Sequence, residues 1–207
     1  MRVPTRRLVV LALAGALPFA LALAGLFAFR DAEATPAYRG SRPPEGMKAS
    51  DFRLRSYTGK DVRLADLRGK ALALTFLDAQ CKDACPIVAA VVPRAKALLT
   101  PSERGRVAFV AISTDPTEDT PAAVRAFLRR YRAEGALDYL VAPAPAVRRS
   151  WRAYGVLASE RSGSDSLHSA PVRIYQPDGE WVSSLSAGVD LSPRNLAHDL
   201  RVALAAD

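Results

Sequence analysis

The sequence has few residues that offer sulfur or imidazole ligands to a metal or that form covalent cross-links. Of its 207 residues, two are cysteine, two are histidine and two are methionine. Two cysteines are too few for a disulfide-stabilised scaffold. Because they lie only four positions apart, a bond between them would close a very small loop and add little stability. The methionines, Met1 and Met47, lie in the N-terminal segments, so methionine ligation is not expected.

The sequence also lacks a dense cluster of basic residues. Its formal net charge is +8, but arginines spread along the whole chain produce this charge. Nucleic-acid-binding proteins usually concentrate basic residues on one stripe and interleave aromatic residues, and no such stripe is present. The composition therefore argues against nucleic-acid binding. It indicates a solvated basic surface, which can still favour an acidic protein partner.

The longest apolar run lies near the N-terminus and covers residues 8–29 without a charged residue. Such a run is long enough to cross about 30 Å of hydrocarbon as a helix. Arg2, Arg6 and Arg7 precede the run, so residues 1–7 are expected to stay in the cytoplasm. The sequence therefore predicts one transmembrane anchor, with the rest of the chain outside the cytoplasm.

A cleaved signal peptide is the alternative for this segment. Ala32-Glu33-Ala34 resembles a small-residue cleavage site, but the apolar core of a signal peptide normally spans only about 7–15 residues. The length of the run favours an uncleaved anchor, and the segment has no cysteine to which a lipid could be attached. Residues 30–50 are rich in proline and glycine and lack periodicity, which predicts a flexible tether before a folded domain over 51–207.

The sequence of this domain predicts a mixture of strands and helices. Two short alternating stretches around the turn at 57–60 predict an opening N-terminal hairpin. Strand and helix order of this kind predicts an α/β fold, a mixed central sheet flanked by helices, with sites beyond the carboxyl ends of strands. The other expected elements are buried strands over 71–77 and 107–113, a helix after Cys85 that Pro93 kinks or delays, a helix from Pro121 to Gly135, a short strand over 139–141, a short helix over 146–154, a hairpin around 176–179 and a helix over 193–205.

Cys81 and Cys85 follow the first buried strand. Cys85 lies near the start of the predicted helix, whose N–H groups and dipole stabilise a thiolate. Lys82 adds a positive charge nearby, whereas Asp78 and Asp83 oppose ionisation. The C-x-x-x-C spacing allows the two sulfurs to close a disulfide or to bind one ion, and two thiolates suit Cu(I) or zinc. The spacing alone leaves redox chemistry and metal binding open.

A site with two thiolates usually needs a further ligand, and the chain offers two histidines. His198 lies within the last predicted helix among polar residues, which indicates a surface histidine. His168 lies in a Ser/Gly-rich loop directly before the strand at 172–175. A loop histidine is more often solvated than ligating, so its position alone does not assign it to a metal site.

Three motifs follow one another along the domain: CKDACP at 81–86, ISTDPTEDTP at 112–121, and LHS around His168 with a PDG turn behind it. In this order they resemble the Sco/SenC family, thioredoxin-like copper proteins of cytochrome c oxidase assembly, from about residue 51 to the C-terminus. The resemblance implies a thioredoxin-like fold and copper, as Cu(I) and/or Cu(II), bound by Cys81, Cys85 and His168. It implies delivery to the dinuclear copper site of oxidase subunit II, or to another cuproenzyme.

The resemblance also implies a location and partners. The domain would face the periplasm from a single-pass anchor in a bacterial inner membrane. Other periplasmic copper chaperones or thiol reductants would be further partners. Asp115 and Asp119 match the acidic positions of the DPxxDTP motif; their expected role is loop structure, with Asp119 capping the helix that starts at Pro121. A role towards a partner or copper is the alternative.

The chain departs from the family pattern at two positions. Lys82 stands where proline is common, and Ala170-Pro171 looks like the cis-proline of thioredoxin-type oxidoreductases, although a trans bond at the start of a strand is the simpler interpretation. The alternative function is therefore a thiol–disulfide oxidoreductase in which Cys81 attacks and Cys85 resolves. Its substrate would be the cysteines of the dinuclear copper site of the same oxidase subunit, and copper delivery and this reduction can coexist in one protein. A thiol peroxidase is disfavoured because Leu77 stands where such enzymes have a threonine.

Overall fold

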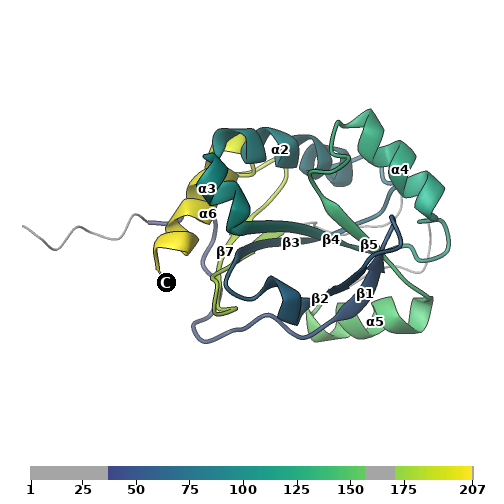
Figure 1. Ribbon diagram of the computed structural model, residues 1–207, viewed down its shortest axis with the longest axis horizontal. Helices are drawn as coiled ribbons and strands as arrows, with labels where there is room; N and C mark the ends of the chain where they lie inside the picture. Colours follow the sequence, from purple (N-terminus) through teal and green to yellow (C-terminus); the bar gives the residue numbers. More distant parts are fainter. Residues whose placement is uncertain (1–36, 157–170, 207) are drawn as a thin grey trace, which may run out of the picture. The chain divides into compact units, whose positions relative to one another are not determined.

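The computed structural model describes residues 37–156 and 171–206 (Figure 1). The predicted anchor at 8–29, and its signal-peptide alternative, lie outside these residues. Within the described part of the chain, no helix is long and apolar enough to cross a membrane. The strands there form one seven-stranded sheet in the order β2-β1-β5-β4-β3-β6-β7.

The centre of the sheet is built from two apolar strands. β3 (Ala71–Leu77) and β4 (Val107–Ser113) match the predicted ranges and pair in parallel along their whole length. Neither strand alternates in polarity, because both of its faces are covered. β5 (Asp138–Val141) continues the parallel order beside β4, whereas β6 (Val172–Tyr175) pairs antiparallel with β3. The carboxyl ends of β3, β4 and β5 therefore meet at one edge.

Two hairpins complete the sheet, and both were predicted. β1 (Arg53–Ser56) and β2 (Asp61–Arg63) pair antiparallel, and β1 also pairs with β5. β6 pairs with β7 (Trp181–Leu185) at the other side of the sheet. The turn glycines, Gly59 and Gly179, both have a φ of 91°, a conformation that costs glycine little.

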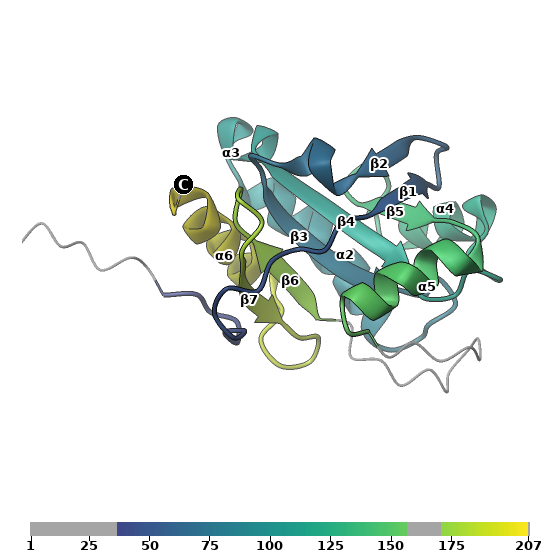
Figure 2. The same cartoon turned by 90° about the horizontal axis from the view of Figure 1, so that it is seen from below.

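Helices cover both faces of the sheet, as predicted (Figures 1 and 2). One hydrophobic core joins α2, α4 and α6 to one face, and a second core joins α5 to the other. The helices are α2 (Ala84–Leu98), α3 (Pro101–Gly105), α4 (Pro121–Arg130), α5 (Ala144–Ala153) and α6 (Pro193–Ala205), with a short 3-10 helix at Leu64–Leu67.

Two helix predictions were wrong in detail. α4 ends at Arg130 rather than near Gly135, because Arg132 adopts a φ of 58° and the chain turns back. α2 begins at Ala84, one residue before Cys85, and runs through Pro93 as one helix. The predicted delay therefore does not occur, and the alternative, a kink at Pro93, stays a prediction. Buried alanine and valine side chains around Pro93 pack this helix against the core, which offsets the one backbone hydrogen bond that proline removes.

Residues 38–50 fell in the predicted tether, but they lie along the edge of the sheet; we call this segment the N-terminal strap. Ser41 exchanges two backbone hydrogen bonds of 2.9 Å with Ser184 of β7. The backbone N–H of Trp181 donates to the Met47 carbonyl at 2.7 Å. The compact unit of the chain therefore begins at Tyr38 rather than at Asp51.

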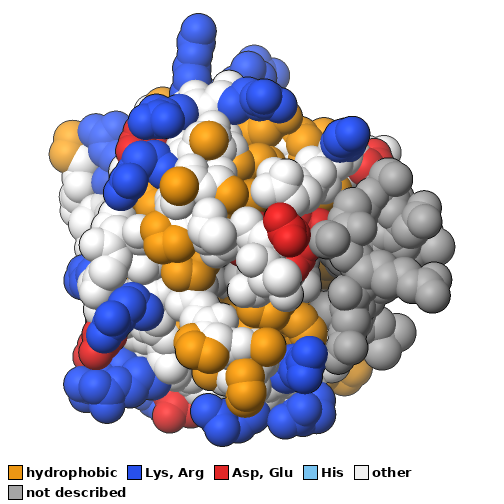
Figure 3. All heavy atoms as spheres, turned by 90° about the vertical axis from the view of Figure 1, so that its right-hand side faces the viewer, with side chains coloured by type: hydrophobic (Ala, Val, Ile, Leu, Met, Phe, Trp, Pro, Cys, Tyr) orange, Lys and Arg blue, Asp and Glu red, His pale blue; other side chains and the backbone are white. Residues whose placement is uncertain are grey.

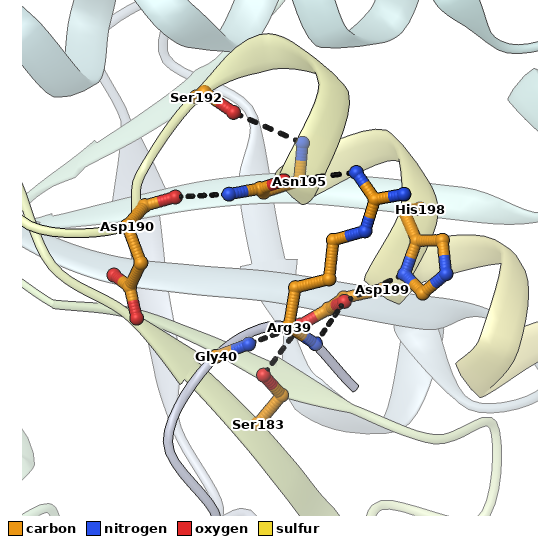
Figure 4. Close-up of polar contacts among 8 residues, drawn as sticks. All are labelled: Arg39, Gly40, Ser183, Asp190, Ser192, Asn195, His198 and Asp199. Carbon is orange, nitrogen blue, oxygen red and sulfur yellow. Dashed lines mark hydrogen bonds and ion pairs between the residues drawn. The ribbon is translucent and has the colours of Figure 1, made fainter. Parts of the chain in front are cut away.

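Asp199 of α6 holds the start of the strap (Figure 4). Its carboxylate is fully buried and accepts hydrogen bonds from the backbone N–H groups of Arg39 (2.8 Å) and Gly40 (3.1 Å). The Ser183 hydroxyl donates to it at 2.6 Å. His198 is partly exposed, as predicted, and its Nδ1 lies 3.0 Å from the same carboxylate. One buried side chain thus joins the strap, β7 and α6.

Candidate functional site

The two cysteines lie where the chain passes from β3 into α2, at the edge where the parallel strands end. The Asp78 carbonyl accepts a hydrogen bond from the Cys81 N–H at 3.2 Å, and its side chain accepts one from the Gln80 N–H at 2.6 Å. These contacts turn the chain tightly after the strand. Cys81 is half-buried, and Cys85 in the first turn of α2 is buried; both are free thiols.

A hydrogen bond between the two sulfurs divides their chemistry. It lowers the pKa of Cys81 to about 5, helped by the backbone N–H groups of Asp83 and Cys85 and opposed by burial and by the charge of Asp78. The same bond, together with burial, raises the pKa of the Cys85 thiol far above its usual range. At neutral pH the pair therefore consists of an accessible thiolate and a buried thiol that donates to it.

The sequence predicted that the helix N-terminus would favour ionisation of Cys85, and this was wrong. The N–H groups of the first turn act on Cys81, because Cys85 lies inside that turn and its own sulfur is buried. Lys82 is exposed and is not among the main contributors to the lowered pKa of Cys81. The predicted opposition by Asp78 is confirmed.

Asp119 ties the cysteine loop to the loop between β4 and α4. Its buried carboxylate accepts hydrogen bonds from the Ala79 N–H at 2.9 Å, and from the hydroxyls of Ser113 and Tyr139 at 2.7 Å each. The Tyr139 hydroxyl also lies 2.7 Å from the Leu77 carbonyl. Burial raises the pKa of Asp119 to about 6, although all three hydrogen bonds act in the opposite direction.

The predicted capping role of Asp119 was wrong, because the next residue caps α4. The Thr120 hydroxyl accepts a hydrogen bond from the Ala123 N–H at 3.2 Å. Asp115 has the structural role that was predicted for it. One of its oxygens accepts hydrogen bonds from the Thr117 and Glu118 N–H groups, both at 3.1 Å. The acidic residues of this motif thus shape the loop, and Asp119 also supports the cysteines.

His168 and Ala170 lie outside the described residues, so neither the predicted histidine ligand nor the peptide bond before Pro171 is part of this geometry. Among the described residues, no three His, Cys, Asp or Glu side chains are grouped as a metal site. Leu72 of β3 pairs with Tyr175 of β6, and Leu74 pairs with Arg173, so the two strands run in opposite directions. Because the two strands are antiparallel, β6 starts at the edge where β3 ends.

Comparisons with known proteins identify the family to which the chain is similar. The family model described as SCO1/SenC matches residues 41–205. A Stutzerimonas stutzeri protein named as a candidate copper-binding protein is 30% identical over 129 residues, which cover 60% of this chain. The match spans 62% of the length of that relative.

Two solved structures show the same fold. BsSco, described as having a disulfide switch and as a member of the Sco family of cytochrome c oxidase assembly proteins, has a TM-score of 0.66 at 19% identity, over 81% of this chain and 99% of that chain. Bradyrhizobium japonicum ScoI with copper bound has a TM-score of 0.60 at 23% identity, over 75% of this chain and 98% of that chain. The predicted thioredoxin-like fold is confirmed, and copper is bound in a Sco protein that has it.

Proposed function

The chain belongs to the SCO1/SenC family, and on that premise we propose that it binds copper and delivers it to the dinuclear copper site of cytochrome c oxidase subunit II. The observation that carries this proposal is the pair of free, hydrogen-bonded sulfurs at the carboxyl edge of the sheet. Soft thiolates select copper over hard cations. Another cuproenzyme with a similar copper site is an alternative recipient.

In this proposal Cys81, Cys85 and His168 bind the copper ion. Cys81 supplies a thiolate at neutral pH, because its pKa is about 5. Cys85 is protonated in the metal-free protein, so the ion replaces the proton between the two sulfurs. Binding through both cysteines therefore releases a proton, as is usual when thiols become metal ligands.

The start of β6 supports His168 as the third ligand. Pro171 and Val172 lie at the edge where β3 ends, which is also the edge of the cysteine loop. His168 precedes Pro171 by three residues, and three residues of extended chain span roughly 10 Å. A neutral imidazole would complete a three-ligand site and leave the ion open on one side.

Transfer to a partner follows from the unequal exposure of the two sulfurs. Cys81 is half-buried and Cys85 is buried, so an incoming ligand of the partner reaches the ion from the Cys81 side. Cys85 regains its proton when the ion leaves, because burial and the neighbouring sulfur both favour its neutral form. This protonation favours release of the cargo.

We also propose that residues 8–29 anchor the protein in the inner membrane of a bacterium, with residues 1–7 in the cytoplasm and the copper-binding domain in the periplasm. The uncharged apolar run and the three arginines before it support this topology. Anchoring would keep the domain next to a membrane-bound oxidase.

A thiol–disulfide reductase is the second candidate, and the unequal thiols favour it. The Cys81 thiolate would attack a partner disulfide, forming a mixed disulfide and releasing one partner thiolate. The Cys85 thiol would then lose its proton and attack the Cys81 sulfur. The resulting Cys81–Cys85 disulfide leaves the partner reduced by two electrons, and a thiol reductant would restore the pair.

A copper titration of the full chain in detergent tests the proposal. The reduced protein is expected to take up one Cu(I) in competition with a chelator, and Cys81→Ala, Cys85→Ala and His168→Ala are each expected to weaken binding. His198→Ala is the matched control and should bind as tightly as the wild type. If His168→Ala also binds as tightly, the three-ligand site is wrong. Metal-free reductase activity that needs both cysteines and ignores His168 would favour the second candidate.

A further inference from the structure

An open groove lies beside the candidate site, between the β4–α4 loop, the end of β5 and the start of α5. Its volume is about 690 Å³. None of the apolar residues that line it is buried except Leu54. A cleft of this size with an apolar lining has the usual form of a binding groove, and proline-rich surface loses little conformational freedom when a partner docks. The partly or fully exposed apolar residues are Pro116, Pro121, Val141, Ala142, Pro143 and Ala146.

Basic residues flank this groove. α4 and α5, which begin on either side of it, carry three exposed arginines each and no acidic residue. Arg53 and Arg55 line the groove itself, and the two share one carboxylate, that of Asp61, at 3.4 and 3.5 Å. Figure 3 shows apolar side chains across the described part of this face, with acidic side chains near its centre and Lys and Arg side chains at its upper, left and lower margins. The carboxylates on this side include those of Asp61 and Asp119 in the groove lining and of the exposed Glu118, and Glu134 pairs with Arg125 of α4 at 3.7 Å. The eight arginines, three from each helix and two from the groove, therefore outnumber these four carboxylates.

The groove is connected to the cysteine loop through one side chain. Asp119 contributes to the groove wall and also accepts the hydrogen bond from the Ala79 N–H. Ala79 precedes Cys81 by two residues. A protein seated in the groove would therefore be separated from the cysteine loop by the Asp119 side chain.

We propose that this groove and its flanking arginines, which we call the docking face, bind an acidic protein partner that inserts an exposed apolar segment. The proposal rests on the proposed function, because it names the kind of surface that the copper recipient presents. Charge complementarity steers such a partner towards the face, and the apolar groove sets its position beside Cys81.

Binding of metal-free partners tests the docking face without involving copper. The probe is the copper-binding domain of the oxidase subunit II encoded in the same genome, titrated onto the full chain in detergent at several salt concentrations. Two variants change the face. Arg53→Gln/Arg55→Gln removes two positive charges, and Pro143→Asp adds a negative charge at the N-cap of α5, where aspartate is a favourable residue and the fold should be kept.

The matched control removes two arginines elsewhere. Arg94 and Arg104 are exposed in α2 and α3, and α3 leads into β4, so Arg104 lies towards the amino edge of the parallel strands. Arg94→Gln/Arg104→Gln therefore changes the net charge by the same amount away from the docking face. We expect each docking-face variant to weaken association about tenfold at low salt and to flatten its salt dependence, with little effect from the control.

The outcomes separate this proposal from the proposed function. Three results would overturn the docking face. All variants could bind the partner as tightly as the wild type, the control could lose as much affinity as the docking-face variants, or the wild type could fail to bind the partner at all. Self-association of the chain that the docking-face variants abolish would assign the face to a second copy and overturn it as well. Copper titration of the same variants should match the wild type, because none of the changed residues is a proposed ligand. A wild type that binds the partner but no copper would leave the docking face standing and remove the proposed function.

Discussion

Cys81 and Cys85 are chemically different although they are the same residue type in one short loop. The neighbouring sulfur and burial raise the pKa of Cys85, against one backbone hydrogen bond from Asp78. Cys81 is less buried, and the backbone N–H groups of Asp83 and Cys85 help to lower its pKa. Burial and one S–H···S hydrogen bond thus determine which of the two cysteines is the thiolate. This assignment suits both of the candidate functions, since each needs one accessible thiolate and one reserve thiol.

Removing the donor thiol should therefore change the other cysteine. In Cys85→Ala the pKa of Cys81 is expected to rise from about 5 towards the value of a free thiol, about 8.5, because the largest favourable contribution is lost. The pH dependence of the Cys81 alkylation rate measures this shift. A folded pKa below the unfolded value stabilises the protein above the unfolded pKa, and this stability is lost as the pH falls through about 5.

The alkylation midpoint of wild-type Cys81 provides the comparison, and His198→Ala serves as a control that leaves the loop intact. If Cys81 titrates near pH 5 in both Cys85→Ala and the wild type, the helix N-terminus, rather than the thiol of Cys85, lowers its pKa.

At the scale of elements, the strands and hairpins that have continuous or alternating apolar patterns could be predicted from the sequence. β3 and β4 are uninterrupted apolar runs, and both hairpins contain a turn glycine, so their ranges could be read directly. The end of α4 could not, because Arg132 occupies a left-handed conformation that sequence signals associate with glycine. The role of Asp119 was also hidden. Its partners come from three different elements that only the fold brings together.

Asp119 allows a test of how the two loops depend on each other. Asp119→Ala leaves the Ala79 N–H and the Ser113 hydroxyl without their buried acceptor, which should lower the free energy of unfolding by about 2–4 kcal/mol. Asp119→Asn should cost less. Its amide oxygen can still accept from Ala79, and its NH₂ group can donate to the two hydroxyls. Urea denaturation measures both effects.

The same carboxyl adds a pH dependence that the asparagine variant should lack. Its folded pKa, about 6, lies above the unfolded value. Its contribution to stability is therefore complete below the unfolded pKa, about 3.9, and is lost as the pH rises through about 6. The difference in the free energy of unfolding between wild type and Asp119→Asn should therefore change between pH 4 and pH 7. A constant difference would mean that the folded pKa of this carboxyl is not raised by burial.

At the scale of the whole molecule, the chemistry and the attachment of the strap lie on different parts of the sheet. The cysteine loop and the groove occupy the carboxyl edge of β3, β4 and β5, whereas the N-terminal strap pairs with β7 and is held by Asp199 of α6. The strap therefore joins the beginning of the compact unit to its last helix. A sequence rich in proline and glycine concealed this, because its hydrogen bonds are made to distant residues rather than within the segment.

Gly40 should be the most sensitive position of the strap. A Cβ at this residue would lie 2.4 Å from both the Ser183 hydroxyl and the Ser184 carbonyl oxygen. Neither neighbour can yield easily, because one is backbone and the other is hydrogen-bonded to Asp199. Gly40→Ala must therefore move the strap and break its contacts to Asp199. We expect a loss of roughly 2 kcal/mol or more in the free energy of unfolding, measured by urea denaturation.

Gly105→Ala is the matched control for this change. Gly105 ends α3, has no positive φ, and a Cβ there would meet nothing within 4 Å. Alanine at such a position should be neutral or should stabilise the protein by about 0.4–1 kcal/mol, because it restricts the unfolded chain. Comparing the two variants separates the clash of the new methyl group with Ser183 and Ser184 from the general effect of replacing glycine with alanine. Equal stabilities of the two variants would mean that the strap is free to leave the sheet edge, and that the domain is held together by its sheet and helices without it.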